Sequence, residues 1–395
     1  MYRRLLVLAL GTFAVGTDGF VIAGILPEIS RSLHTNAAAT GLLVTMFAFT
    51  YAVSSPIIAA TTAHWPRKRL LIAGLLILAV GNVLTATLPL YGLVLAGRVI
   101  AGLGAGMFTP TASATAASLV EPHQRGRALA VVMAGLSSAT ALGAPIGTVI
   151  GSQTNWQTTL WFVAALAVLG AVGVAVLLPA VPAAHVAGLR ERLATMKDAR
   201  IGFTLLTTLL VFTGLFTDYT FVGESFGRAT GGNGIALAIL LFLWGAGATV
   251  GSVTAGHLTD RISGQRIIAV AVVIVGLDFA LLPFSSRTFA TAAVALFVWG
   301  VCGWATLVPL QHRLIEVSPE HAPVSIGLNA SATYLATAAS GLTGAAGIAA
   351  FGAYNLGPFG LIFLALGLVA SIVSARFVHT RRPAPAVPVP TAAEH

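Results

Sequence analysis

The sequence has few charged residues. Only 8% of its 395 residues are Asp, Glu, Lys or Arg, whereas a soluble domain carries about 25%. So few charges cannot cover a water-facing surface, which excludes a soluble globule. Instead, 57% of the residues are hydrophobic and the mean hydropathy is +0.92. These values indicate a chain that lies mostly in hydrocarbon.

Several chemical signatures are also missing. The single cysteine, Cys302, cannot form an intramolecular disulfide, and no Cys/His metal spacing occurs. There is no Walker-type phosphate loop and no HExxH zinc pattern. The glycines of Gly102–Gly106 lie within an apolar stretch and do not follow a strand, so they are not a dinucleotide fingerprint. We therefore expect no cofactor, no metal and no enzymatic activity.

Long apolar stretches dominate the chain. A helix needs about 20 apolar residues to cross roughly 30 Å of hydrocarbon. Twelve stretches meet that requirement: 5–27, 40–62, 69–88, 91–117, 127–151, 157–179, 202–224, 234–256, 266–284, 289–311, 323–350 and 356–378. The sequence thus predicts an all-α membrane protein with twelve transmembrane helices.

The basic residues are distributed unevenly between the loops. If the N-terminus lies inside, 17 of the 21 Lys and Arg fall in inner segments. The outer loops then hold only Arg31, Arg228 and Arg287, and Arg98 lies within a span. This bias follows the positive-inside rule. It explains the formal charge of +9 by topology rather than by nucleic-acid binding, and predicts a plasma-membrane protein with both termini cytoplasmic.

The predicted spans fall into two groups of six. We expect an N-terminal half at 1–180, a cytoplasmic linker at 181–201, a C-terminal half at 202–380 and a disordered, Pro/Ala-rich tail at 381–395. Thr17–Val21 in the first span resembles Thr217–Val222 in the seventh. Two such repeats are typical of transporters that bind their substrate at mid-membrane between the halves.

Four patterns then occur in order at particular spans. The loop pattern Gly-x-Leu-x-Asp-Arg-x-x-Gly-x-Arg runs from Gly256 to Arg266, and a degraded copy runs from Ala59 to Lys68. The fourth span contains Arg98-x-x-x-Gly102-x-Gly104-x-Gly106, the fifth contains Leu142–Gly151, and Phe20–Ile29 ends the first. Together they resemble the major facilitator superfamily, specifically its twelve-span drug/proton antiporter branch of bacterial chloramphenicol, sugar and purine exporters.

This resemblance implies two pseudo-symmetric six-helix halves and an alternating-access mechanism. We expect a monomeric, proton-coupled efflux transporter that exports a small amphipathic drug or metabolite. An uptake symporter or a facilitator on the same fold remains open, and a membrane-embedded enzyme or a channel is a more distant alternative. The degraded first loop has Ala63 where the family pattern has Asp.

Ionisable residues inside spans are the candidates for proton coupling, because each costs about 2.5–3.5 kcal/mol to insert unless it has a partner or a task. Asp18 and Arg98 lie at similar predicted depths, so they could form an ion pair whose protonation frees Arg98. A static pair that only fixes helix packing is the alternative. Asp218 is the repeat mate of Asp18 and a third proton-coupling candidate. Whether Glu224 and Asp278 have functions stays open.

Polar residues at helical spacing are candidates for the substrate cavity. They lie on the fourth, seventh and eleventh spans: Thr109, Thr217, Asn329, Thr333 and Tyr334. Trp299 and Trp304 are further aromatic candidates for contact with a flat ligand.

The gating candidates are residues that allow close helix packing or resemble the family's loop. Gly143, Pro145 and Gly147 are expected to form, with Gly245–Gly256 of the eighth span, a movable seam between the halves. Ordinary packing without gating is the alternative. Asp260 and Arg261 in the second loop pattern complete the gating set.

Overall fold

The computed structural model describes residues 2–62, 64–181 and 194–379. Most of the predicted linker, 182–193, and all of the predicted tail, 381–395, lie outside the described residues, as does Ala63. Within the described ranges, twelve helical spans are long and apolar enough to cross a membrane. The predicted fold class and the number of spans are therefore confirmed.

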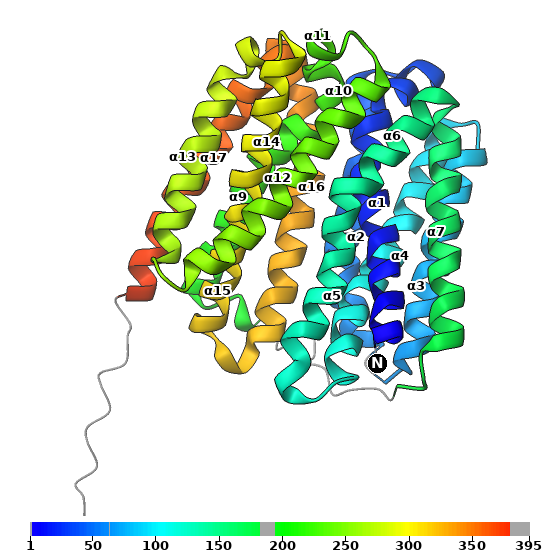
Figure 1. Cartoon of the computed structure of the whole chain (residues 1–395), viewed down its shortest axis with the longest axis vertical. Helices are drawn as coiled ribbons and strands as arrows, with labels where there is room; N and C mark the ends of the chain where they lie inside the picture. The colour runs from blue at the N-terminus through cyan, green and yellow to red at the C-terminus, as the bar shows by residue number, and fades with distance from the viewer. Residues whose placement is uncertain (1, 63, 182–193, 380–395) are drawn as a thin grey trace, which may run out of the picture.

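The first six spans form the N-terminal half, coloured blue to green in Figure 1. Their helices are α1 (Tyr2–Ser32), α2 (Ala37–Thr61), α3 (Arg67–Thr87), α4 (Tyr91–Ser118), α5 (Arg125–Ser138), α6 (Ala144–Gln153) and α7 (Trp156–Leu177). A π-helical segment, η2 (Ala139–Gly143), joins α5 to α6 within the fifth span. A short 3-10 turn, η1 (Pro122–Gln124), precedes α5.

The other six spans form the C-terminal half, coloured green to red in Figure 1. Its long helices are α9 (Ala199–Thr220), α12 (Gly234–Thr259), α13 (Gly264–Ser285), α14 (Phe289–Ala305), α15 (Leu307–Val317), α16 (Ala322–Phe351) and α17 (Leu356–His379). Four short segments lie between them: α10 (Val222–Ser225), α11 (Gly227–Thr230), η3 (Pro319–His321) and η4 (Ala353–Asn355). The helices α14 and α15 together make the tenth span.

Side-chain caps define where several helices begin. The Oδ1 atom of Asn36 accepts from the Ala39 amide at 3.0 Å, and that of Asn155 accepts from the Thr158 amide at 2.9 Å. Asn233 accepts from two amides at the start of α12. Each cap satisfies backbone donors that the first turn of a helix leaves free. The caps explain why short turns here separate helices that are otherwise continuously apolar.

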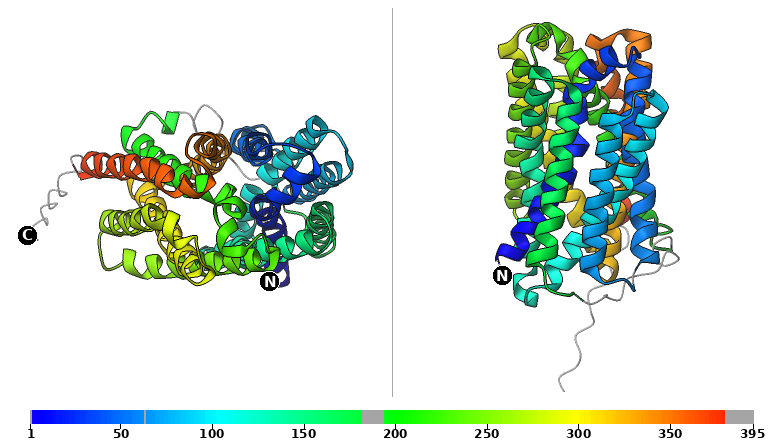
Figure 2. Two further views of the ribbon diagram at one scale, coloured as in Figure 1. Left: turned by 90° about the horizontal axis from the view of Figure 1, so that it is seen from above. Right: turned by 90° about the vertical axis from the view of Figure 1, so that its right-hand side faces the viewer.

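The halves lie side by side, as the view from above in Figure 2 shows. They meet along two pairs of helices and through α1. In the α2–α16 seam, the Thr45 hydroxyl donates to the Ala338 carbonyl at 2.8 Å. In the α6–α12 seam, α12 packs against η2 and α6. Between these seams, α1 packs against α9, α10 and α12 of the C-terminal half.

Candidate functional site

Asp18 and Arg98 meet in the middle of the N-terminal half. Asp18 lies near the centre of α1 and Arg98 lies in the first half of α4. The Arg98 Nη1 atom lies 2.8 Å from Asp18 Oδ1, and the side chains are 1% and 0% exposed. The predicted ion pair is therefore present, whereas its role in proton coupling stays a prediction.

The pair is incompletely satisfied by its surroundings. Among the described residues, Asp18 Oδ2 and Arg98 Nε have no hydrogen-bond partner. The Arg98 guanidinium lies 4.6 Å from the centre of the Phe47 ring, which adds a cation–π contact. Buried ions need both a counter-charge and hydrogen bonds to offset lost hydration. Asp18 Oδ2 is therefore the carboxylate oxygen of this pair that is left without a donor among the described residues.

Two tyrosines connect this pair to the other half. Tyr51 of α2 and Tyr334 of α16 stack with ring centres 3.5 Å apart and planes 18° apart. Tyr334 also lies within electrostatic reach of Asp18. A change in the charge of Asp18 would thus act on Tyr334, which forms part of the contact between the halves. Asp18 and Arg98 themselves both belong to the N-terminal half.

Asp218 has a different environment from its repeat mate. It is 1% exposed in α9, and in the described part of the chain neither carboxylate oxygen accepts a hydrogen bond of regular geometry, although the Ser225 hydroxyl lies close enough to interact with the carboxylate. Asp278 of α13 lies within electrostatic reach of Asp218. The two acids lie on the seventh and ninth spans, and nothing in their spacing along the sequence paired them. The C-terminal half therefore holds two acids that interact electrostatically, where the N-terminal half holds an ion pair.

The five cavity candidates have different surroundings. Thr217 is fully buried, and its hydroxyl lies 2.8 Å from that of Thr343. Asn329 is 1% exposed and accepts from the Thr208 hydroxyl at 2.7 Å. These two side chains are engaged in α9–α16 packing. Thr109, Thr333 and Tyr334 are half-buried, so the cavity role of all five stays a prediction.

Most of the glycines that were predicted to lie between the halves instead pack within one half, so that prediction is wrong for them. A Cβ on Gly143 or Gly147 would collide with Thr17 or Val21 of α1, so these glycines allow packing inside the N-terminal half. Gly247 and Gly251 of α12 likewise face α14. Only Gly245, among the glycines proposed for the seam, packs across it, against Thr140 of η2. Glycine spacing predicts close packing but does not name the neighbouring helix.

Two proposed gating features remain without a direct test. Pro145 lies at the start of α6, directly after the π-helical turn. Proline lacks the amide proton that would continue the hydrogen-bond ladder, which accounts for an irregular span at this point. Asp260 and Arg261 lie in the exposed turn between α12 and α13. Their gating roles stay predictions.

An aromatic cluster surrounds Phe20, and little of it was predicted from the sequence. Phe20 of α1 contacts rings of the other half, with ring centres 5.8 to 6.3 Å apart: Phe216, Tyr219, Trp244 and Trp304. The Tyr219 hydroxyl also donates to the Phe20 carbonyl at 3.3 Å. Of this cluster only Trp304 was predicted. The helical spacing of Phe212, Phe216 and Tyr219 on one span was the available signal.

Contacts between the halves concentrate toward one end of the bundle. Along α2 they run from Gly41 to Tyr51, and along α16 from Tyr334 to Gly341. Gly223 lies against Pro27, and Gly234 against Ser152, near the same end. Beyond these contacts, Val53 and Ile57 of α2 are 43% and 42% exposed. The bundle is closed at the end opposite the start of α1.

Metal-ligand geometry does not occur at the site. Within residues 2–62, 64–181 and 194–379, no three His, Cys, Asp or Glu side chains come together as metal ligands would. The buried groups at the site are one ion pair, two carboxyls that interact electrostatically and a group of aromatic rings.

The chain is similar in sequence to a known protein family and to individual transport proteins. The Major Facilitator Superfamily model matches residues 8–341. An inner membrane transport protein of Escherichia coli, YdhP, is 31% identical over 373 residues, covering 94% of this chain and 96% of its own length. A chloramphenicol resistance protein of Streptomyces lividans is 32% identical, covering 97% and 98% of the two chains.

A solved structure has the same arrangement of helices. The crystal structure of the nucleoside transporter NupG matches with a TM-score of 0.74 and 14% identity, over 95% of this chain and 99% of that one. At this identity the likeness shows the fold alone. The relatives and the fold are those of transporters rather than enzymes. The chain is a multi-pass membrane protein that belongs to the Major Facilitator Superfamily of transporters.

Proposed function

We propose that this protein exports a small amphipathic molecule in exchange for protons. The observation that carries the proposal is the buried Asp18–Arg98 pair, in which one carboxylate oxygen lacks a partner among the described residues. The chloramphenicol resistance relative supports efflux as the direction and makes chloramphenicol the first substrate to test.

The two members of the pair suit different roles in coupling. An arginine keeps its charge under physiological conditions, so Arg98 acts as a permanent counter-charge. An aspartate can take up a proton, and neutral Asp18 would no longer hold Arg98 at 2.8 Å. The freed guanidinium then needs another partner, which favours a different arrangement of α1 and α4. A proton thereby shifts the conformational equilibrium through its differential affinity for two states.

The closed end of the bundle indicates which conformational state of the transport cycle the structure represents. The positive-inside topology directs the start of α1 to the cytoplasm, so the closed end opposite it faces outward. On this topology both termini are cytoplasmic and the structure corresponds to an inward-facing state. Substrate would enter from the cytoplasm or inner leaflet, and protonation would be linked to the return of the empty carrier.

The aromatic cluster fits an amphipathic substrate. Phe20 contacts rings of three helices in the other half. Aromatic faces bind flat apolar groups, and the indole Nε1 of Trp244, which has no hydrogen-bond partner among the described residues, offers a polar contact. Because this region combines elements of both halves, a bound substrate would be sensitive to their relative movement. We propose that a single chain contains the complete site and works as a monomer.

The test is substrate-driven proton movement in proteoliposomes loaded with a pH-sensitive dye. Purified protein receives chloramphenicol and a panel of amphipathic drugs and metabolites, and proton flux and substrate flux are recorded together. We expect opposed fluxes for wild type, and loss of proton movement for Asp18→Asn and Arg98→Ala. The matched control is Glu121→Gln, since the Glu121 side chain is 76% exposed.

Each alternative gives a different result. Substrate movement without proton movement would reject antiport and favour a facilitator. Proton and substrate movement in the same direction would favour an uptake symporter. Unchanged coupling in both site variants would mean that Asp18 and Arg98 do not couple proton movement to transport, and Asp218 would be the next residue to test.

A further inference from the structure

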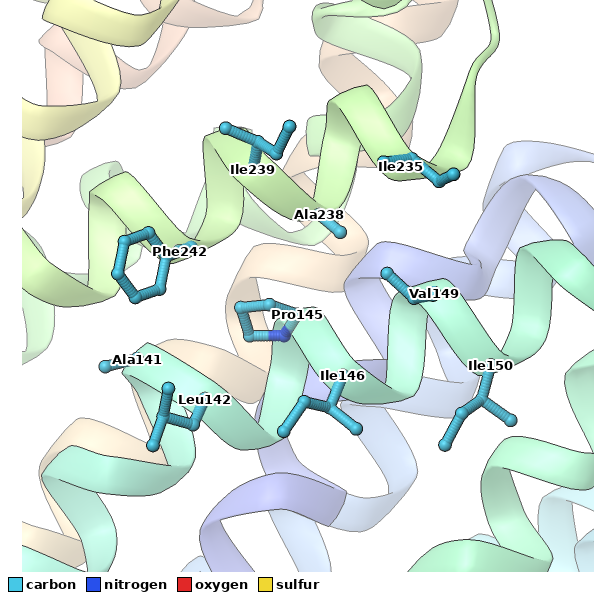
Figure 3. A pocket seen from close by; sticks show the side chains of 10 residues that line it. All are labelled: Ala141, Leu142, Pro145, Ile146, Val149, Ile150, Ile235, Ala238, Ile239 and Phe242. Atoms are coloured by element: carbon cyan, nitrogen blue, oxygen red, sulfur yellow. The ribbon is translucent and has the colours of Figure 1, made fainter.

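A groove lies on the membrane-facing surface where the two halves meet. It runs along the α6–α12 seam, has a volume of about 380 Å³ and has an entirely apolar lining. Figure 3 shows Pro145 between the two helices, with Ile235 and Ile239 on α12 and Ile146 on α6. Ile146, Ile235 and Ile239 are 44 to 45% exposed, so the groove is open toward lipid.

The length of the groove matches one leaflet of a bilayer. Along the fifth span it extends from Ala141 to Ile150, which is about 13 Å at roughly 1.5 Å per residue. Half of a hydrocarbon core of about 30 Å is about 15 Å. An extended acyl chain could therefore lie in the groove from the bilayer centre to the interface.

A polar pocket continues from the end of this groove. It begins at Gly151, the residue after Ile150 of the groove, and at Gly234, the residue before Ile235 of the groove. Its volume is about 1110 Å³. Arg31, Asn155 and Trp161 are among its lining residues. Tryptophan is enriched at membrane interfaces, and a long arginine side chain can reach the level of the headgroups.

Arg31 provides the charge that a phosphate group would need. Its side chain is 74% exposed and lies 3.3 Å from Glu28 Oε1, while its Nε donates to the Pro27 carbonyl at 3.2 Å. The guanidinium has five N–H donors, so these contacts leave donors for an additional anion. Arginine binds phosphate by paired hydrogen bonds.

We propose that the groove and the polar pocket together bind one phospholipid. An acyl chain fills the apolar groove, and the headgroup phosphate lies beside Arg31. The continuity of an apolar channel of leaflet length with a polar pocket carrying an exposed cation favours a phospholipid over a purely apolar molecule. Because the groove is lined by α6 of one half and α12 of the other, the bound lipid contacts both halves.

The experiment uses the full chain in liposomes that contain a trace of phosphatidylglycerol with a photoactivatable acyl chain. After illumination, labelled peptides are mapped by mass spectrometry. We expect about tenfold more label on the groove peptides than on the lipid-exposed face of α13 around Leu277, which would reflect a preference of about 1.4 kcal/mol. Similar labelling of both faces would mean ordinary annular lipid and would overturn the proposal.

Two variant pairs separate chain binding from headgroup binding. Ile239→Trp fills the groove and should reduce its label to that of the α13 face, whereas Leu277→Trp should not. Arg31→Ala should reduce labelling by the phospholipid but not by a diacylglycerol with the same photoactivatable chain. Arg287→Ala is the matched control, because Arg287 Nε bonds to the carbonyl of Pro283, four residues before it, as Arg31 does to Pro27.

Other outcomes contradict the proposal in specific ways. If phospholipid and diacylglycerol label the groove equally and Arg31→Ala changes neither, the headgroup assignment is wrong. If the groove stays unlabelled while the protein forms dimers in the liposome, a second copy occupies this face. Thermal unfolding of each variant in detergent checks that loss of label does not reflect loss of fold.

Discussion

Removing one member of the Asp18–Arg98 pair should destabilise the protein unequally, depending on which member is lost. Asp18→Asn leaves a buried guanidinium without its counter-charge, and Arg98 cannot become neutral. Breaking a buried ion pair in this way costs about 3–5 kcal/mol. The Phe47 contact at 4.6 Å offsets about 1 kcal/mol of that. We therefore expect Asp18→Asn to lower the free energy of unfolding by about 3 kcal/mol.

Replacing Arg98 instead of Asp18 should lower the free energy of unfolding by a smaller amount. Arg98→Gln leaves Asp18 without its cation, but a protonated carboxyl avoids most of the cost of a buried charge. The double variant removes both charges, so its loss should be smaller than the sum of the single losses. For two groups in direct contact at 2.8 Å, a coupling energy of about 1–3 kcal/mol is expected.

The assay is unfolding in mixed micelles titrated with sodium dodecyl sulfate, followed by helical circular dichroism. The four proteins of the cycle are compared with Glu121→Gln, which replaces an exposed carboxylate and should behave as wild type. Additive losses, with a coupling energy below about 0.5 kcal/mol, would refute the inference that this pair is an energetically coupled unit. Equal losses in the two single variants would refute the argument from protonation.

Three further predictions test other parts of the structure. Gly341→Leu should hold the closed end apart, since a Cβ there would collide with the Gly41 carbonyl. We expect faster maleimide labelling of Thr45→Cys in a Cys302→Ala background, and no change with Gly92→Leu, where a Cβ meets nothing within 4 Å. Phe20→Ala should weaken binding of a flat amphipathic drug, measured by tryptophan quenching, by about 1–2 kcal/mol because it removes a ring from the aromatic cluster; unaltered affinity would exclude the cluster from the substrate site. Glu224 lies in α10, outside the membrane-spanning helices, and burial raises the pKa of its carboxyl group. The folded state therefore holds the carboxyl proton more tightly than the unfolded state. Wild type should therefore lose stability relative to Glu224→Gln as the pH rises above about 4.3, and a difference in thermal midpoint that is constant between pH 4 and 7 would contradict this.

The agreement between sequence and structure is best where a property depends on position along one helix. The depth of Asp18 and Arg98 in their spans could be counted from the sequence, and the structure joins them at 2.8 Å. The number of spans follows equally directly, because a bilayer requires about 20 apolar residues for each crossing.

Agreement is poorer where a property depends on which helices are neighbours. Gly143 and Gly147 were expected between the halves but face α1 within one half. The rings around Phe20 come from three helices, and only their arrangement in space makes a cluster. The electrostatic interaction of Asp278 with Asp218 was likewise not predicted, since the two acids lie on different spans, α13 and α9.

The sequence by itself determined that this protein lies in a membrane, how many times it crosses and which residues carry charge inside it. These properties follow from the transfer energies of individual side chains, which depend on composition and spacing. Only the tertiary structure decided which glycine faces which helix, which rings surround Phe20, and that an apolar groove continues into a polar pocket at the α6–α12 seam. Those properties depend on how each helix is rotated and crossed by its neighbours, and this is set by the packing of many side chains at once.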